Sequence, residues 1–219
     1  MTREKFFKEL RDIHDSVIVM GNQAIEAIDK SIIALMRQDK LAAKEVIDGD
    51  QDIDEQEEMI TSKGLHILLS QQPMANDFKE ISAVMKLVVD MERIADQASD
   101  IARLSMNFNG PFIKKIEHIP AMSEVAKQMV RDSLKAFIDN DQDLAIRIIE
   151  EDDRLDDLYQ TVRKELIGAI PDANEGNAEQ VVDLLIIAKY LERIGDHATN
   201  ICEWIIFNNT GFHKSNKLL

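Results

Sequence analysis

The sequence contains few residues of the kinds that form turns and sheets, and only one cysteine. Its 219 residues include 8 Gly, 4 Pro, 2 Tyr, 1 Trp and 1 Cys. This scarcity excludes an all-β fold, which needs frequent turn residues and many β-branched or aromatic side chains. The single cysteine, Cys202, excludes an intrachain disulfide and a zinc site with several thiolates. It continues the apolar stripe of Leu191, Gly195 and Ala198 at helical spacing, so we expect it to be a core residue.

Positive charge and long apolar runs are also scarce. Lys and Arg number 26 against 41 Asp and Glu, which gives a net charge of -15. Nucleic-acid binding depends on many basic contacts to phosphates, so this balance argues against nucleic acid and favours cations or basic partners. Even the longest apolar runs, such as residues 184–188, are far short of the roughly 20 residues that span a membrane. No apolar signal segment follows Met1, so we expect a cytoplasmic protein, peripheral to a membrane at most through protein partners.

The remaining composition favours long helices. Hydrophobic residues make up 45% of the chain and recur at helical spacing between the prolines. Asp39 and Asp141 stand where the pattern lapses, and an Asp side chain can cap the helix that follows. The sequence therefore predicts an all-α fold of six long helices, at about 5–38, 40–71, 75–108, 121–139, 142–169 and 177–208.

The chain is an internal repeat. Residues 91–101 and 191–201 share Glu, Arg, Ile, Asp, Ala and a final Ile at equivalent positions. Ser31 and Ala34 likewise match Ser133 and Ala136. A repeat of this length predicts two copies of one structural unit. We therefore expect two tandem three-helix bundles, formed by residues 1–110 and 116–219, with a linker at 109–120.

Acidic residues follow one line along the last helix of each repeat. Glu92, Asp96 and Asp100 stand at i, i+4 and i+8, which places them along one side of a helix. The second repeat has Glu192, Asp196 and Asn200 in the same places. Like charges four residues apart repel one another. Arg93 and Arg193, one residue further along, are expected to point elsewhere, so the line predicts a bound cation.

The preceding helix of each repeat carries a second acidic line. If the second and third helices form an antiparallel hairpin that turns at Pro73, Asp96 lies level with Asp50, and Glu92 with Asp54. The same construction about Asn174 sets Asp196 beside Asp152 and Glu192 beside Asp156. We call the first four carboxylates cluster 1 and the second four cluster 2. Oxygen-only ligand sets suit hard cations, so we expect iron, magnesium, manganese or calcium rather than zinc or copper.

Two other interpretations of the acidic lines remain open. They could be solvated faces of a purely structural helical spacer, or ligands of a carboxylate-bridged di-iron enzyme. Ferritin-type di-iron sites use Glu-x-x-His pairs, and no Glu of this sequence has a His three residues later. The five histidines share no ligand spacing, and only His197, beside Asp196, is expected to be able to reach a cluster. The sequence contains no nucleotide loop or activated nucleophile, so it predicts no catalytic and no cofactor-binding residues.

Three segments resemble a known family. Residues 92–96 (Glu-Arg-Ile-Ala-Asp), 192–200 (Glu-Arg-Ile-Gly-Asp-His-Ala-Thr-Asn) and 71–77 (Gln-Gln-Pro-Met-Ala-Asn-Asp) are similar to the PhoU family of bacterial phosphate-uptake regulators. The resemblance extends from about residue 5 to 208. It implies metal ions on Glu92 and Asp96 and on Glu192 and Asp196, with Asp100 and Asn200 as the following members. Because Asn200 is neutral and Gly195 replaces Ala95, we expect the second site to bind fewer ions or to bind them more weakly.

The resemblance also implies a function. PhoU-family proteins are non-enzymatic negative regulators of phosphate uptake and phosphate-starvation signalling, often homodimers. They link a phosphate ABC transporter to a sensor histidine kinase. We therefore expect a metal-binding helical adaptor with these partners.

Overall fold

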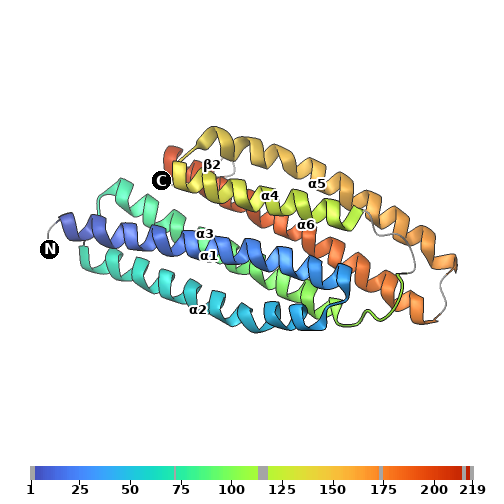
Figure 1. Ribbon diagram of the computed structural model, residues 1–219. Helices are drawn as coiled ribbons and strands as arrows, with labels where there is room; N and C mark the ends of the chain where they lie inside the picture. The colour runs from blue at the N-terminus through green and yellow to red at the C-terminus, as the bar shows by residue number, and fades with distance from the viewer. Residues whose placement is uncertain (1–2, 72, 113–117, 173–174, 214–215, 218–219) are drawn as a thin grey trace.

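The protein is an all-α molecule of six long helices, as expected (Figure 1). The computed structural model describes residues 3–71, 73–112, 118–172, 175–213 and 216–217. The helices are α1 (Arg3–Arg37), α2 (Lys40–Gln71), α3 (Ala75–Ser105), α4 (His118–Asp139), α5 (Gln142–Ala169) and α6 (Glu175–Thr210), with a short 3-10 turn, η1 (Ile170–Asp172), after α5. Among these described residues, no helix combines the length and the hydrophobicity that crossing a bilayer would require.

The first connection of each repeat uses the same turn. Gln38 and Asn140 adopt left-handed backbone conformations, with φ of 53° and 49°, and end α1 and α4. The next residue then caps the following helix: Asp39 Oδ1 accepts from the Leu41 backbone N–H at 3.0 Å, and Asp141 Oδ1 accepts from that of Leu144 at 2.9 Å. These contacts confirm the predicted Asp caps.

Helix boundaries differ from the sequence prediction near Pro120 and at the C-terminal ends of α3 and α6. Helix α4 begins at His118 instead of residue 121, so Pro120 lies in its first turn. Proline is tolerated there because first-turn N–H groups have no intrahelical acceptor. Helix α3 ends at Ser105, before residue 108, whereas α6 continues to Thr210. Beyond Gly211, β1 (Phe212–His213) pairs antiparallel with β2 (Asn216–Lys217). Of the residues beyond Gly211, 214–215 and 218–219 lie outside the described residues.

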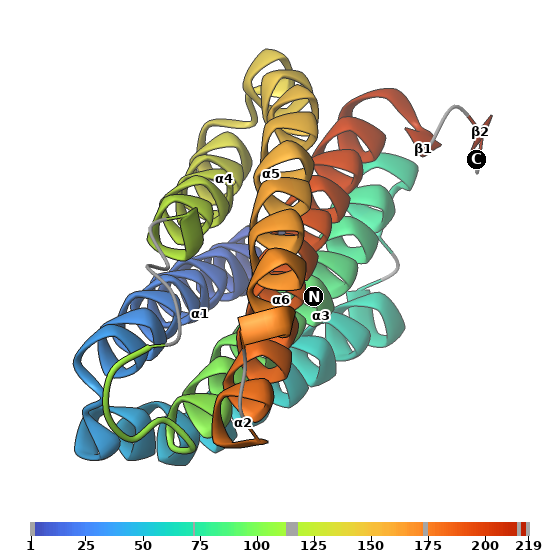
Figure 2. The same cartoon turned by 90° about the vertical axis from the view of Figure 1, so that its right-hand side faces the viewer.

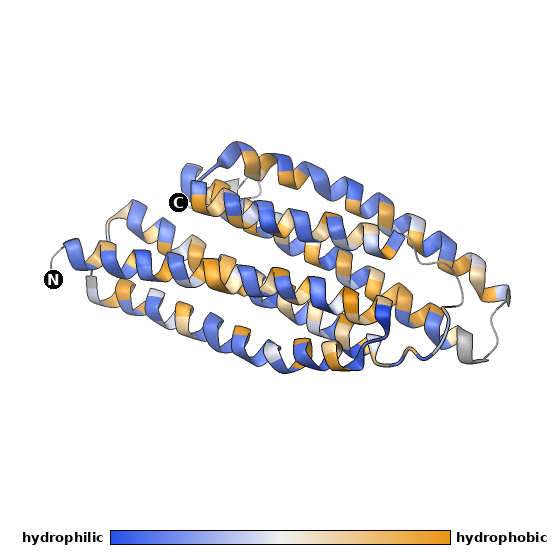
Figure 3. Ribbon diagram, viewed as in Figure 1, coloured by the Kyte–Doolittle hydropathy of each residue, from blue (hydrophilic) through white to orange (hydrophobic). Residues whose placement is uncertain are grey.

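Helices α3 and α6 form the most extensive helix pair and occupy the centre of the molecule. Helices α1 and α2 pack on α3, and α4 and α5 pack on α6 (Figures 1 and 2). Helix α1 also contacts α4, whereas α2 and α5 lie at opposite edges of the molecule. Each helix carries both hydrophobic and hydrophilic residues along its length, as amphipathic packing requires (Figure 3).

One hydrophobic core extends through both repeats. Its members include Ile94 and Ala98 of α3 and Ile194 and Ala198 of α6, all 0% exposed. Cys202 belongs to the same core, as expected, and burial raises the pKa of its thiol to about 12. The separate folding of residues 1–110 and 116–219 stays a prediction, and in the whole chain the two repeats share this core.

The internal repeat is visible in the packing of equivalent residues. Ser31 of α1 and Ser133 of α4 are both fully buried. Each hydroxyl donates to a carbonyl three residues earlier, Ser31 to Ile28 at 2.9 Å and Ser133 to Val130 at 2.8 Å. Two halves with the same helix order and equivalent buried contacts confirm the two-repeat architecture.

Candidate metal centres

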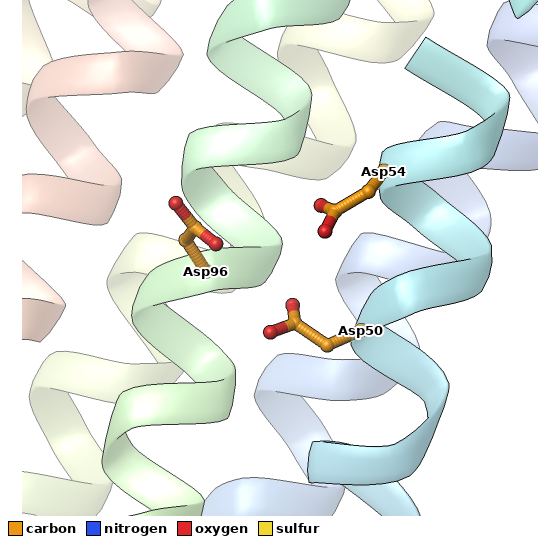
Figure 4. A group of neighbouring side chains, drawn as sticks. All are labelled: Asp50, Asp54 and Asp96. Atoms are coloured by element: carbon orange, nitrogen blue, oxygen red, sulfur yellow. The ribbon is translucent and has the colours of Figure 1, made fainter. Parts of the chain in front are cut away.

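Cluster 1 lies between α2 and α3. Asp50 and Asp54 project from successive turns of α2 toward Asp96 of α3 (Figure 4). One carboxylate oxygen from each of the three lies within 4.8 Å of the others. The structure therefore brings these three residues together in the register expected of an antiparallel α2–α3 hairpin.

Burial and mutual repulsion both act on cluster 1. The Asp50 side chain is 14% exposed and that of Glu92 is 21% exposed. Burial raises the pKa of Asp50, Asp54 and Glu92, and the negative charge of Asp96 raises each of them further. Glu92 is thus coupled electrostatically to the cluster, although it is outside the group of three converging oxygens. A cation at this position would relieve the repulsion.

Two arginines pair with the carboxylates of cluster 1. Arg93 Nε lies 3.4 Å from Glu92 Oε2, and Arg93 Nη1 lies 3.1 Å from Asp96 Oδ2. The expectation that Arg93 points elsewhere is therefore wrong, because its long side chain lies along its own helix and reaches Asp96. Arg103 Nη2 lies 3.4 Å from Asp50 Oδ2. Both arginine side chains are more than half exposed, so each pair contributes about 0–1 kcal/mol.

Cluster 2 is the equivalent group between α5 and α6. Burial raises the pKa of Asp152 to about 6, with further contributions from the charges of Asp196, Asp156 and Glu192. Burial also raises the pKa of Asp196. The other three predicted carboxylates therefore all act on Asp152. Among the described residues, however, only cluster 1 has three donor oxygens within 4.8 Å of one another.

A lysine contacts cluster 2. Lys189 of α6 forms an ion pair with Glu192 Oε2, one helical turn further along. Its Nζ also lies 5.5 Å from the ring centroid of Tyr159 on α5. Burial opposes the ammonium form, but Glu192 and Asp196 outweigh that effect and raise the pKa of Lys189. Sequence reasoning missed this residue, although its position three residues before Glu192 was a usable signal.

Gly195 permits close packing beside cluster 2. A β-carbon at this position would lie 2.3 Å from Leu155 Cδ2 and 3.3 Å from Asp152 Oδ1. The first repeat has Ala95 at the equivalent position, buried at 1% exposure. The difference between Ala and Gly that the sequence shows is thus explained by the position of Leu155.

Asp100 and Asn200 contact residues outside the two clusters. Asn200 Nδ2 donates to Asp90 Oδ1 at 3.2 Å, and His197 Nδ1 lies 2.9 Å from the same oxygen. Burial raises the pKa of Tyr190, and the negative charge of Asp100 raises it further, so these two side chains lie close to each other. These contacts join α3 to α6, so the structure does not bring Asp100, Asn200 or His197 into the clusters. Eight residues of α-helix leave a rotation of about 80°, which turns the third member of each line away from the first.

The residues of cluster 1 fit a single hard cation. Its donors are all carboxylate oxygens, the ligand type of magnesium, calcium, manganese and iron. Oxygens that share one such ion lie about 3–5 Å from one another, and the 4.8 Å grouping of cluster 1 falls within that range. Cluster 2 has the same donor types, with an ammonium group in contact.

Comparisons with known proteins match both repeats. The model of the PhoU domain matches residues 17–105 and 119–205. The phosphate-specific transport system accessory protein PhoU homolog of Clostridium acetobutylicum is 35% identical over 213 residues, which cover 96% of this chain and 97% of that protein. The phosphate-specific transport system accessory protein PhoU of Escherichia coli K12 is 30% identical over 93% of this chain and 84% of that protein.

Two solved structures have the same fold. The crystal structure of PhoU from Pseudomonas aeruginosa matches with a TM-score of 0.90 at 30% identity, over 94% of this chain and 100% of that one. The phosphate transport system regulatory protein PhoU from Streptococcus pneumoniae matches with a TM-score of 0.89 at 27% identity, over 95% of this chain and 98% of that one. The similarity therefore extends over both bundles.

Proposed function

Because this chain belongs to the PhoU family over both of its repeats, we propose that it is a negative regulator of phosphate uptake and phosphate-starvation signalling. Its curated relatives are named accessory proteins of phosphate-specific transport, which supports a role beside a transporter. In this proposal the protein acts by binding, as a homodimeric adaptor between a phosphate ABC transporter and a sensor histidine kinase in the cytoplasm.

The proposal includes metal ions on clusters 1 and 2. The observation that carries this part is the convergence of Asp50, Asp54 and Asp96 from two helices. Iron, magnesium, manganese or calcium would suit these oxygens. A bound ion would hold α2 to α3 in cluster 1 and α5 to α6 in cluster 2.

Metal binding would also change the surface that a partner meets. The chain has a net charge of -15, and eight of its carboxylates belong to the two clusters. Unneutralised, these carboxylates favour a basic partner surface, whereas bound cations reduce that attraction. This change of surface charge is the means by which metal occupancy would affect adaptor function.

The geometry favours a binding protein over a di-iron enzyme. Ferritin-type sites project into the centre of a four-helix bundle and include Glu-x-x-His ligands. Cluster 1 instead lies between two helices on the solvent side, with the Asp96 side chain 31% exposed and Asp54 exposed. A carboxylate pair open to water on this surface suits reversible binding of an ion better than an enclosed oxidase centre.

Deletion of the gene tests the regulatory role. In a strain without a second copy, we expect raised phosphate-starvation gene expression or raised phosphate accumulation in phosphate-rich medium. The wild-type gene should restore repression. An unchanged phosphate response in the deletion strain would contradict the proposal.

A thermal measurement distinguishes metal-binding clusters from a purely structural helical spacer. If the clusters hold metal, EDTA should lower the melting temperature of protein purified without chelator, and added divalent metal should restore it. A purely structural spacer with solvated acidic faces would show no difference. Elemental analysis of the same preparation identifies the ion.

A further inference from the structure

The two clusters differ in charge at two equivalent positions. Lys189 of α6 has Val89 as its counterpart in α3, where the valine is 40% exposed. Tyr159 of α5, which the lysine contacts, has Glu57 as its counterpart in α2. Cluster 1 therefore has a nearby acid where cluster 2 has an aromatic ring, and an apolar side chain where cluster 2 has an ammonium group. The two substitutions occur in side chains that touch each other.

The Lys189 ammonium lies between the two helices that form cluster 2. It pairs with Glu192 Oε2, an oxygen shielded from solvent in a side chain that is 13% exposed. The same Nζ lies over the Tyr159 ring, 5.5 Å from its centroid, so the lysine reaches from α6 to α5. A cation over an aromatic face is attracted by the ring as well as by the carboxylate. The ammonium thus has two independent attachments at the cluster.

The arginines of cluster 1 leave its three donor oxygens close to one another. Arg93 pairs with Glu92 and Asp96 along its own helix. Asp50, Asp54 and Asp96 nevertheless converge within 4.8 Å, so the position of a metal ion among them is preserved. Cluster 2 lacks that convergence among the described residues, and one of its four carboxylates is in contact with an ammonium. A compact ammonium group resembles a metal ion as a point charge more closely than a planar guanidinium does.

We propose that Lys189 is an internal counter-ion of cluster 2, whose ammonium competes with a metal ion for Glu192 and is displaced from Glu192 and Tyr159 when the metal binds. This inference rests on the proposed metal binding and specifies how one of the two sites is regulated. Its consequence is that cluster 2 loads at a higher metal concentration than its four carboxylates alone would require. Loading also releases a lysine on the α5–α6 surface, which gives the metal-bound protein a different charge pattern there.

Calorimetric titration with Mn²⁺ alone tests the competition, on full-length protein in which cluster 2 has been isolated by the substitutions Glu92→Gln and Asp96→Asn. In this background Lys189→Met should tighten Mn²⁺ binding about three- to fivefold, near the upper end of what one partly exposed charge pair contributes. Lys5→Met is the matched control, since it removes the same charge from an exposed ion pair within α1 and should change the affinity by less than about twofold.

The repeat provides the reciprocal variant. With cluster 2 disabled by Glu192→Gln and Asp196→Asn, Val89→Lys should weaken Mn²⁺ binding at cluster 1 by a similar factor. A second readout follows the lysine itself: acylation of Lys189 by an amine-reactive reagent, quantified by mass spectrometry in the wild-type protein, should become faster at saturating Mn²⁺.

The outcomes separate the two proposals. Tighter binding after Lys189→Met, with little effect of Lys5→Met, supports the counter-ion. Equal Mn²⁺ affinity with and without Lys189, or acylation of Lys189 that Mn²⁺ does not change, overturns the counter-ion and leaves metal binding in place. Absence of Mn²⁺ binding in the wild type, in both isolated clusters and after Lys189→Met overturns both.

Discussion

Gly195 and Leu155 pack so closely that the glycine cannot acquire a side chain without movement of the leucine, since a β-carbon would lie 2.3 Å from Leu155 Cδ2. Helices α5 and α6 therefore approach each other at the level of cluster 2 in a way that depends on one missing methyl group.

Gly195→Ala should destabilise the protein by about 1–3 kcal/mol, the usual cost of overpacking a filled core. Chemical denaturation of metal-free protein measures it. Gly168→Ala is the control, because a β-carbon there would meet nothing within 4 Å and alanine is the better helix former. We expect that variant to be as stable as the wild type or more stable. Equal stability of Gly195→Ala and Gly168→Ala would contradict the close packing.

Simultaneous Glu92→Gln and Asp96→Asn should abolish metal binding at cluster 1. Loss of a single residue that merely orients a metal ligand lowers affinity 10- to 100-fold, so loss of the converging carboxylate of Asp96 together with the neighbouring charge of Glu92 should exceed about 100-fold. The metal-free double variant should be no less stable than the metal-free wild type, because two repelling charges are removed and the Arg93 pairs are exposed. Titration calorimetry and thermal unfolding measure the two effects.

Glu192→Gln with Asp196→Asn is the matched variant for cluster 2, and it should remove less total metal. The neutral charge of Asn200 does not account for this difference, because Asn200 contacts Asp90 instead of the cluster. The Lys189 ion pair with Glu192 now provides the reason. Unchanged metal binding in both double variants would mean that the acidic lines are solvated faces.

Stability of the metal-free protein should depend on pH through Asp152. Its pKa rises from 3.8 to about 6 on folding, so between these values the folded state binds more protons than the unfolded state. The contribution of Asp152 to stability therefore falls as pH rises from about 4 to 6. Asp152→Asn should raise the melting temperature by about 1–3 °C more at pH 7.5 than at pH 5. The exposed Asp157 of the same helix, changed to Asn, is the control, and an equal effect at both pH values for Asp152→Asn would contradict the coupling.

Residues 1–110 and 116–219, expressed separately, should each give a helical fragment. Each fragment retains three helices that pack on one another, but it exposes the face of α3 or α6 that the other repeat covers. We therefore expect both fragments to be less stable than the whole chain and to associate when mixed. Circular dichroism and analytical ultracentrifugation test this, and two unfolded fragments would contradict two independent bundles.

The fold could be predicted because its signals are local and repeated. Local signals are the caps at Asp39 and Asp141 and the helical spacing of apolar residues, because each depends on nearby residues. The repeat is recognised by comparing two short segments, 91–101 and 191–201. The register that joins Asp50 to Asp96 followed from the position of Pro73 alone, because an antiparallel hairpin fixes which residues lie level.

The parts that sequence reasoning missed depend on side-chain direction and on packing between repeats. Asp100 continues the acidic line in sequence, but the helix turns it toward Tyr190. The Arg93 side chain lies along its own helix beside Asp96, and the spacing of residues in the sequence does not determine that direction. The close approach of Leu155 to Gly195 depends on how α5 rests on α6, and no single segment encodes that distance.

The antiparallel α3–α6 pair brings equivalent segments of the two repeats against each other. Asp90 of the first repeat meets His197 and Asn200 of the second, and Asp100 meets Tyr190. This is the arrangement of an isologous interface, in which one surface packs against its own copy across a two-fold axis. The two repeats of this one chain thus face each other as two copies of a single-repeat chain would in a homodimer. Because both sides belong to one chain, a residue of one half can differ from its counterpart in the other half. The second repeat therefore has Lys189 and Tyr159 where the first has Val89 and Glu57.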